Sequence, residues 1–173
     1  MTSFLKMFFT LFIFVPQSLL AEDTMSNRRI GEMLERLDVE VQGGDGLWRF
    51  FVNDVEVTII TDENADRMRI IAPVSKTEGL LAEEYERVLQ ANFDSALDAR
   101  YAIAKSVLWS AFIHPLSPLT DRQFIEGLGQ VVNLVTTFGT TYHSGSAVFG
   151  GGDSRIIEEQ DLIKKLIERG LAI

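Results

Sequence analysis

The chain of 173 residues contains no cysteine and only two histidines. Without cysteine it can form no disulfide scaffold, no thiolate-ligated zinc site and no cysteine nucleophile. Basic residues are also in the minority, 16 against 25 acidic ones, and a net charge of −9 repels the phosphate backbone of nucleic acids. The apolar content is ordinary for a packed core, so we expect one globular domain with appendages and no nucleic-acid partner.

The first 21 residues, 1–21, predict a secretory signal peptide. Lys6 is their only charge, an apolar run follows over residues 7–15, and Ala21 offers a small residue at the cut before an acidic start. The alternative is an uncleaved anchor, but the run is shorter than the roughly 20 residues that a membrane span needs. We expect cleavage at Ala21, a periplasmic or secreted protein, and no membrane attachment after cleavage.

Hydrophobic periodicity predicts a helix followed by an antiparallel meander in the first half of the remaining chain. Ser26 is placed to cap the helix, Asn53 and Asp54 suit a tight turn, and Pro73 is expected to close the third strand. No crossover helix fits between strands so close in sequence, so they pair antiparallel. The expected elements are a helix over Asn27–Leu37, a loop over Gln42–Gly46, a hairpin over Leu47–Ile60 and a strand over Met68–Ala72.

The second half alternates between helix and strand patterns. Thr120 and Gln123 fit a capping box at the start of a long helix. The expected elements are a helix over Glu78–Leu97, two strands over Arg100–Ala104 and Val107–Ile113, a helix from Asp121 to near Gly139, and an amphipathic helix over Ile156–Ile167. The stripe expected to be buried on the first of these helices comprises Leu81, Tyr85, Val88, Leu89 and Phe93.

These elements define an α+β fold, in which an antiparallel sheet of a three-strand meander plus two strands packs against helices in the order α-β-β-β-α-β-β-α. Glycine and serine concentrate between the last two helices, which is linker composition. The expected organisation is a signal peptide over 1–21, the α+β domain over 22–143, a linker over 144–154 and a C-terminal helix over 155–173.

Patterns that imitate metal and catalytic sites are incomplete. Asp62, Asn64 and Asp66 match the first oxygen ligands of a calcium loop, but Arg67 replaces its turn glycine and Pro73 its bidentate glutamate. His114 and His143 have no HExxH-type spacing, and Ser144-Gly145-Ser146 lies in the linker rather than in a nucleophile elbow. We expect no metal, no cofactor and no catalytic residues.

Small residues and aromatic residues carry the remaining signals. Gly127-Leu128-Gly129 sits within a helix, so it favours close approach to the sheet or to a second copy over dinucleotide binding. Aromatic side chains on the expected strands are mostly core, but one sheet face could keep some for a protein partner. The weak binding candidates are Trp48, Phe50, Trp109 and Phe112.

The element order resembles the class I type III secretion chaperone fold and the YbjN-like domains that share it. The resemblance covers about Ser26–His143 and is clearest over Leu80–Phe93, Leu108–Ile113 and Leu119–Phe124. It implies a small, acidic, non-enzymatic protein that is commonly dimeric and binds extended segments of other proteins. Export and the added C-terminal helix favour the YbjN-like side, since secretion chaperones act in the cytosol.

The sequence therefore predicts a non-enzymatic periplasmic protein-binding domain, with a chaperone or regulatory adaptor role. The alternative is a small-molecule sensor or carrier that uses the groove between helices and sheet. A homodimer is a further expectation, through the long helix from Asp121 and the apolar strand Val107–Ile113. In the competing arrangement, the C-terminal helix folds back over that surface within one chain.

Overall fold

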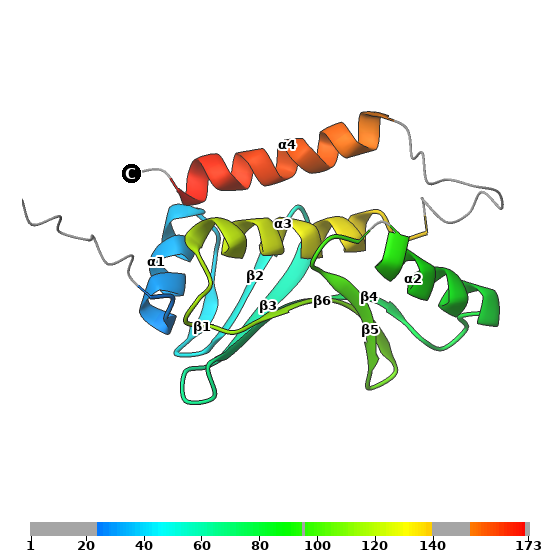
Figure 1. Ribbon diagram of the computed structural model, residues 1–173, viewed down its shortest axis with the longest axis horizontal. Helices are drawn as coiled ribbons and strands as arrows, with labels where there is room; N and C mark the ends of the chain where they lie inside the picture. The colour runs from blue at the N-terminus through cyan, green and yellow to red at the C-terminus, as the bar shows by residue number, and fades with distance from the viewer. Residues whose placement is uncertain (1–23, 95, 140–152, 172–173) are drawn as a thin grey trace, which may run out of the picture.

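The computed structural model describes residues 24–94, 96–139 and 153–171; for residues 94 and 153–160 only the backbone is described. Six antiparallel strands form one sheet in the order β1-β2-β3-β4-β6-β5, with helices packed on one side (Figure 1). The elements are α1 Asn27–Arg36, β1 Gln42–Gly44, β2 Leu47–Val52, β3 Val55–Asp62, β4 Arg67–Lys76, α2 Ala82–Asp94, β5 Arg100–Ala104, β6 Val107–His114, α3 Asp121–Thr136 and α4 Asp153–Gly170. The expected α+β class is confirmed.

Tight turns set the register of the hairpins. Asn53 and Asp54 both have positive φ, 47° and 63°, which is the geometry of a two-residue hairpin turn, and β2 pairs with β3 on either side of them. Lys105 and Ser106 make the same kind of turn between β5 and β6. The turn at Asn53 and Asp54 was expected from the sequence and is confirmed, and the turn at Lys105 and Ser106 joins the two strands expected over Arg100–Ala104 and Val107–Ile113.

The expectation of a loop over Gln42–Gly46 was wrong for its first three residues. Gln42–Gly44 is a short edge strand paired with β2. A side chain at Gly43, whose φ is +96°, would lie 2.3 Å from the carbonyl oxygen of Leu47, so glycine is required for this close pairing. The sequence QGG shows no hydrophobic alternation, because glycine has no side chain. Backbone hydrogen bonds alone pair this strand with β2, and a sequence pattern cannot reveal them.

Pro73 does not end β4, which continues to Lys76. The ladder between β4 and β3 stops at Ile71, so beyond that point β6 is the partner of β4 among the described strands. The register with β6 shifts between Pro73 and Ser75. Proline lacks a backbone N–H, and it is tolerated here because one side of the strand has lost its ladder and the other side is irregular.

The core lies between the sheet and α1 and α3. Strand β2 alternates between exposed and buried side chains, and its inward residues include the fully buried Phe50. The expected capping box is present at α3: Thr120 Oγ1 accepts from the Gln123 amide at 3.2 Å, and Gln123 Oε1 accepts from the Thr120 amide at 3.0 Å. A side chain at Gly127 would lie 2.9 Å from the Phe112 ring of β6, so this glycine brings α3 close to the sheet.

Helix α4 packs across the outer side of α3 (Figure 1). A side chain at Gly129 would lie 2.6 Å from Ile163 Cγ1, and one at Gly170 would lie 2.6 Å from Ile125 Cδ1. The self-association route through α3 was therefore wrong, because the competing arrangement holds: the C-terminal helix covers that surface in the same chain. Strand β6 is likewise paired on both edges, by β4 and β5.

Several expectations fall outside the described residues. The signal peptide and its cleavage at Ala21 lie there, as do His143, Ser144-Gly145-Ser146 and nearly all of the linker over 144–154. Of the linker, only Ser154 and the preceding Asp153 are described, and they belong to α4. Within the described part of the chain, no helix has both the length and the apolar character needed to cross a bilayer.

Candidate functional site

Most of the aromatic residues proposed from the sequence are core residues. Trp48, Phe50 and Phe112 are at most 5% exposed and face the helices, so a partner cannot reach them. Trp109 is half-buried on the opposite face of the sheet. The accessible aromatic of the strands is Phe51, 62% exposed, which the sequence analysis missed. The alternation of β2 held the signal, since Trp48 and Phe50 cannot face inward unless Phe51 faces out.

No described helix covers the outward face of the sheet. Four large apolar side chains on this face are at least 36% exposed, and we call them the sheet face: Leu47, Phe51, Ile60 and Ile113. Leu47 pairs with Ile60, Ile60 with Arg69, and Arg69 with Ile113, so three of the four lie in one row across β2, β3, β4 and β6. Cross-strand neighbours of this kind stand close enough to be contacted together by one ligand.

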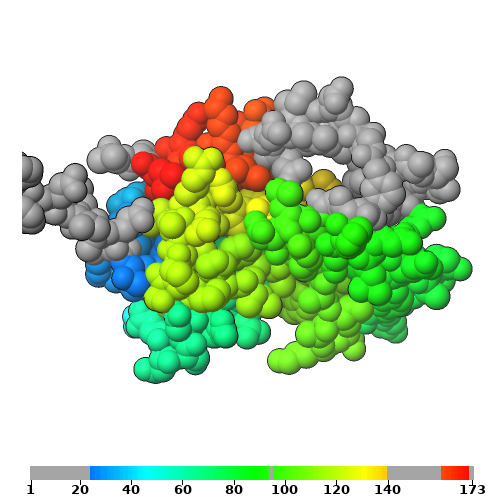
Figure 2. All heavy atoms as spheres, viewed as in Figure 1, coloured from blue at the N-terminus to red at the C-terminus, as the bar shows by residue number. Residues whose placement is uncertain are grey.

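The uncovered side of the sheet is concave. The β3–β4 turn and the β5–β6 hairpin both project away from the helices in Figure 1. In Figure 2 the same two hairpins form separate lobes along the lower edge of the molecule. The sheet face therefore lies on a curved surface between two projecting turns.

A second apolar surface belongs to α2. We call it the α2 surface, and it comprises Leu81, Leu89, Phe93 and Leu97, which are 61% to 91% exposed, together with Ile103 of the neighbouring β5, which is 53% exposed. Leu81, Leu89 and Phe93 were expected to be buried, so that expectation was wrong. Together, the sheet face and the α2 surface hold all of the large apolar side chains that are at least 36% exposed among the described residues.

The orientation of α2 is set by residues that share only Tyr85 and Val88 with the expected stripe. Val88 and Ala91 are buried, and the Tyr85 hydroxyl donates to the Thr77 carbonyl at 3.2 Å. Asn92 accepts from the Tyr101 amide at 2.7 Å and donates to the Tyr101 carbonyl at 3.1 Å, as a neighbouring strand would. These polar contacts turn the leucines and Phe93 outward, which periodicity alone could not reveal.

Among the hollows at the surface of the described residues, a larger one of about 650 Å³ lies where α1, the loop before α3 and the end of α4 meet. A smaller one, of about 310 Å³, includes Phe112, Ile113 and His114 in its lining. The interface between the helices and the sheet, where the sequence placed a possible ligand groove, is filled by core side chains instead.

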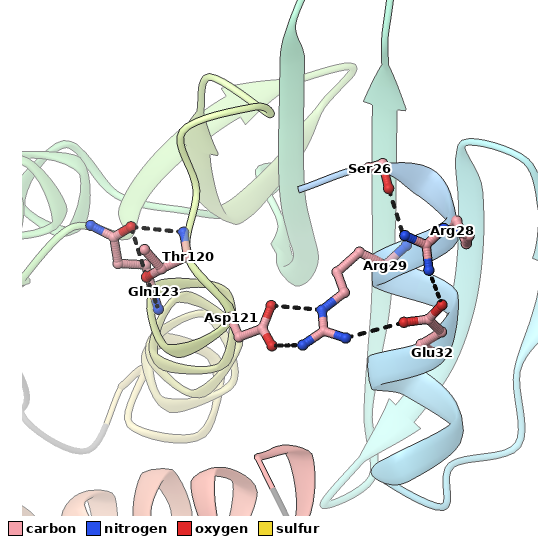
Figure 3. Close-up of polar contacts among 7 residues, drawn as sticks. All are labelled: Ser26, Arg28, Arg29, Glu32, Thr120, Asp121 and Gln123. Atoms are coloured by element: carbon pink, nitrogen blue, oxygen red, sulfur yellow. Dashed lines mark hydrogen bonds and ion pairs between the residues drawn. The ribbon is translucent and has the colours of Figure 1, made fainter. Parts of the chain in front are cut away.

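An ion pair joins Arg29 of α1 to Asp121 of α3 (Figure 3). Both residues also line the larger hollow. Arg29 Nε donates to Asp121 Oδ1 at 3.1 Å, and the Nη2 atom of Arg29 bonds the other carboxylate oxygen. Arg29 also donates to Glu32, and this hydrogen bond is the main reason that the pKa of Glu32 is lowered. The bond to Asp121 chiefly raises the pKa of Arg29, so the guanidinium stays charged and joins α1 to α3.

The acidic turn that resembled a calcium loop serves the fold. Asp66 Oδ1 accepts from the Ser117 amide at 2.6 Å, which is the main reason that the pKa of Asp66 is lowered. Glu63 accepts from the Asn27 amide at the start of α1, at 2.9 Å. Among the described residues no three histidine or acidic side chains gather as metal ligands, and His114 stacks on Phe112 with ring centroids 5.9 Å apart.

No protein-family model and no curated protein matches the chain, but solved structures do. It is similar to ExsC in the crystal structure of the ExsC–ExsE complex, with 16% identity and a TM-score of 0.55, over 69% of this chain and 95% of that one. It is also similar to the Yersinia pestis type III secretion chaperone SycH, crystallised with a stable fragment of YscM2: 16% identity, a TM-score of 0.50, and 64% and 97% of the two chains. These likenesses show a type III secretion chaperone-like fold.

Proposed function

We propose that this chain is a non-enzymatic protein-binding domain with a chaperone or regulatory adaptor role. The observation that carries the proposal is the gathering of large exposed apolar side chains on two surfaces, while the other large apolar side chains of the described residues are buried or half-buried. Patches of this kind mark interaction sites in soluble proteins. Support also comes from the two similar structures, because each is a complex with a second protein.

We further propose that the protein is an exported, YbjN-like member of this fold group. The leader-like residues up to Ala21 and the C-terminal helix α4 support this assignment. The intact mass of the protein from a periplasmic fraction tests the export. We expect a species that begins at Glu22; a membrane-bound species that retains residues 1–21 would refute cleavage.

A second copy of the chain is the partner we propose for the α2 surface. Phe93 is 91% exposed and Leu89 is 68% exposed, and a symmetric pair would bury the same patch twice. Light scattering should give the mass of a dimer for the wild type and of a monomer for Leu89→Ser/Phe93→Ser. Arg36→Ser, at an exposed position on α1, is the matched control, and a monomeric wild type would defeat the dimer.

A small-molecule sensor or carrier remains the second candidate, because the 650 Å³ hollow beside Arg29 has the size of a ligand site. Capture of proteins from periplasmic extract separates the two functions. If the proposal is right, Phe51→Ser/Ile113→Ser abolishes capture, and Arg36→Ser does not. If capture is absent in the wild type while metabolite pools bind and Arg29→Met stops them, the carrier is correct. Turnover in a screen of esters, peptides and glycans would reject a non-enzymatic role.

A further inference from the structure

Positive charge is concentrated on the strands of this acidic protein. The six strands carry five cationic residues, Arg49, Arg67, Arg69, Lys76 and Arg100, and only two anionic ones, Glu56 and Asp62. The rest of the chain holds eleven basic and 23 acidic residues. The sheet therefore has a charge opposite in sign to that of the molecule around it.

These charges lie on the same side as the sheet face. Along β2, β4 and β5 the buried positions face the helices, so Arg49, Arg69 and Arg100 face away from them. In the strand order, these three residues occupy every second strand, and the strands between them present Ile60 and Ile113. Adjacent strands are about 4.8 Å apart, so cationic positions recur about every 10 Å across the strands, with Arg69 in the outward row next to the one that Arg49 and Arg100 share. The two strand carboxylates face the same side, where Asp62 pairs with Arg67 and Glu56 with Phe51, so cations outnumber anions on this face.

Two of these arginines have no anionic partner among the described residues. The helical Arg29 and Arg122 form ion pairs with Asp121 and Glu126, whereas no carboxylate of the described side chains lies within ion-pairing distance of Arg49 or Arg69. Arg100 donates to the carbonyls of Leu97 and Ala99. Arginine is enriched at protein interfaces, where its planar guanidinium can donate two parallel hydrogen bonds to one carboxylate.

We propose that the sheet face binds an acidic segment of a partner protein, in which apolar residues accompany the carboxylates. The inference deepens the proposed function and depends on it. Phe51 and Ile113 supply apolar contact, and Arg49 and Arg69 select negative charge and speed encounter. A nucleic acid would leave the apolar side chains without partners and would be repelled by the acidic remainder. A flat bilayer does not fit a concave surface between two projecting turns.

The test is selection of twelve-residue peptides from a random displayed library on the purified protein. We expect bound sequences to be enriched in Asp and Glu together with apolar residues. A peptide synthesised from the selection should bind about tenfold more weakly to Arg69→Gln, a loss of about 1.4 kcal/mol, because the variant loses the charge-assisted hydrogen bonds to a carboxylate of the peptide. Arg36→Gln, on the helix side, should leave binding unchanged, and raising the salt concentration should weaken it.

The outcomes separate the inference from the proposed function. Peptides that need Phe51 and Ile113 but show no acidic enrichment, or that bind Arg49→Gln/Arg69→Gln as well as the wild type, would overturn the inference and leave the protein-binding role standing. Peptides whose binding is lost only in Leu89→Ser/Phe93→Ser would also overturn the inference, because they bind to the α2 surface and not to the sheet face. No selectable peptide at all would count against both.

Discussion

Gln130 is the buried polar side chain whose replacement gives the sharpest test of the described packing. It lies on α3 and is 6% exposed. Its Oε1 accepts from the amides of Asp98 and Ala99 at 2.9 and 3.0 Å, and its Nε2 donates to Asp98 Oδ2 at 3.2 Å. One side chain thus satisfies two backbone donors immediately before β5, the strand that borders α2.

We predict that Gln130→Leu lowers the free energy of unfolding by about 2–4 kcal/mol. Leucine has a similar size but accepts no hydrogen bond, and an unsatisfied buried donor costs about 1–3 kcal/mol. The Ala99 amide is buried, so leaving it without an acceptor carries the full cost. The Asp98 amide is only part-buried and can bond to water, so its cost is smaller. For a chain of this length, the melting temperature should fall by about 5–15 °C.

Urea unfolding followed by circular dichroism and tryptophan fluorescence provides the measurement. The matched control is Gln90→Leu, the same substitution at an exposed position of α2, which should stay within about 0.5 kcal/mol of wild type. If Gln130→Leu were as stable as Gln90→Leu, the hydrogen bonds to the segment before β5 would contribute nothing, and this reasoning would be refuted.

Further predictions concern the contacts that hold the helices and the acidic turn. Gly129→Leu should push α4 away, because even a Cβ at this position would lie 2.6 Å from Ile163. Faster hydrogen exchange of the α4 amides would show this displacement, and unchanged exchange would contradict it. The carboxylate of Asp66 accepts from the amide of Ser117, which lowers the pKa of Asp66. Its contribution to the free energy of unfolding is complete above the unfolded-state pKa and is lost as the pH falls through the folded-state pKa. In Asp66→Asn, the free energy of unfolding should therefore depend less on pH in that window. Arg29→Met should cost about 1–3 kcal/mol in thermal unfolding, because it leaves a part-buried carboxylate on α3 unpaired; no loss would mean that the ion pair does not stabilise the helix contact.

Local patterns predicted the elements because their causes are local. Alternation along β2 and β3, the positive-φ turn at Asn53 and the capping box at Thr120 each depend on neighbours within a few residues. The pairing of Gln42–Gly44 was missed because it depends on backbone hydrogen bonds alone. The continuation of β4 through Pro73 was missed because it depends on where β3 stops pairing, which is a property of the sheet.

The candidate surfaces were harder to predict, because exposure depends on which neighbours cover a residue. Leu89 and Phe93 have the periodicity of a buried stripe, yet Asn92 bonds to Tyr101 and turns them outward. Gly129 has the character of a close-packing contact, and it is one, but the packing partner is α4 of the same chain. The amphipathic pattern identified apolar residues correctly, and only the tertiary contacts determined which of them remain open.

The two exposed surfaces differ in charge, and this difference assigns their occupants. A symmetric dimer places the same patch on both sides of its axis. A dimer through the sheet face would bring the cationic positions Arg49 and Arg69 of both copies into one interface, and an excess of like charge in an interface costs affinity. Leu89 and Phe93 are neighbours at i and i+4 on α2, and the acidic Glu86 borders them, whereas Arg69 lies between Ile60 and Ile113 in one row of the sheet. Self-association is therefore better placed on α2, which leaves the sheet face open for a segment of opposite charge.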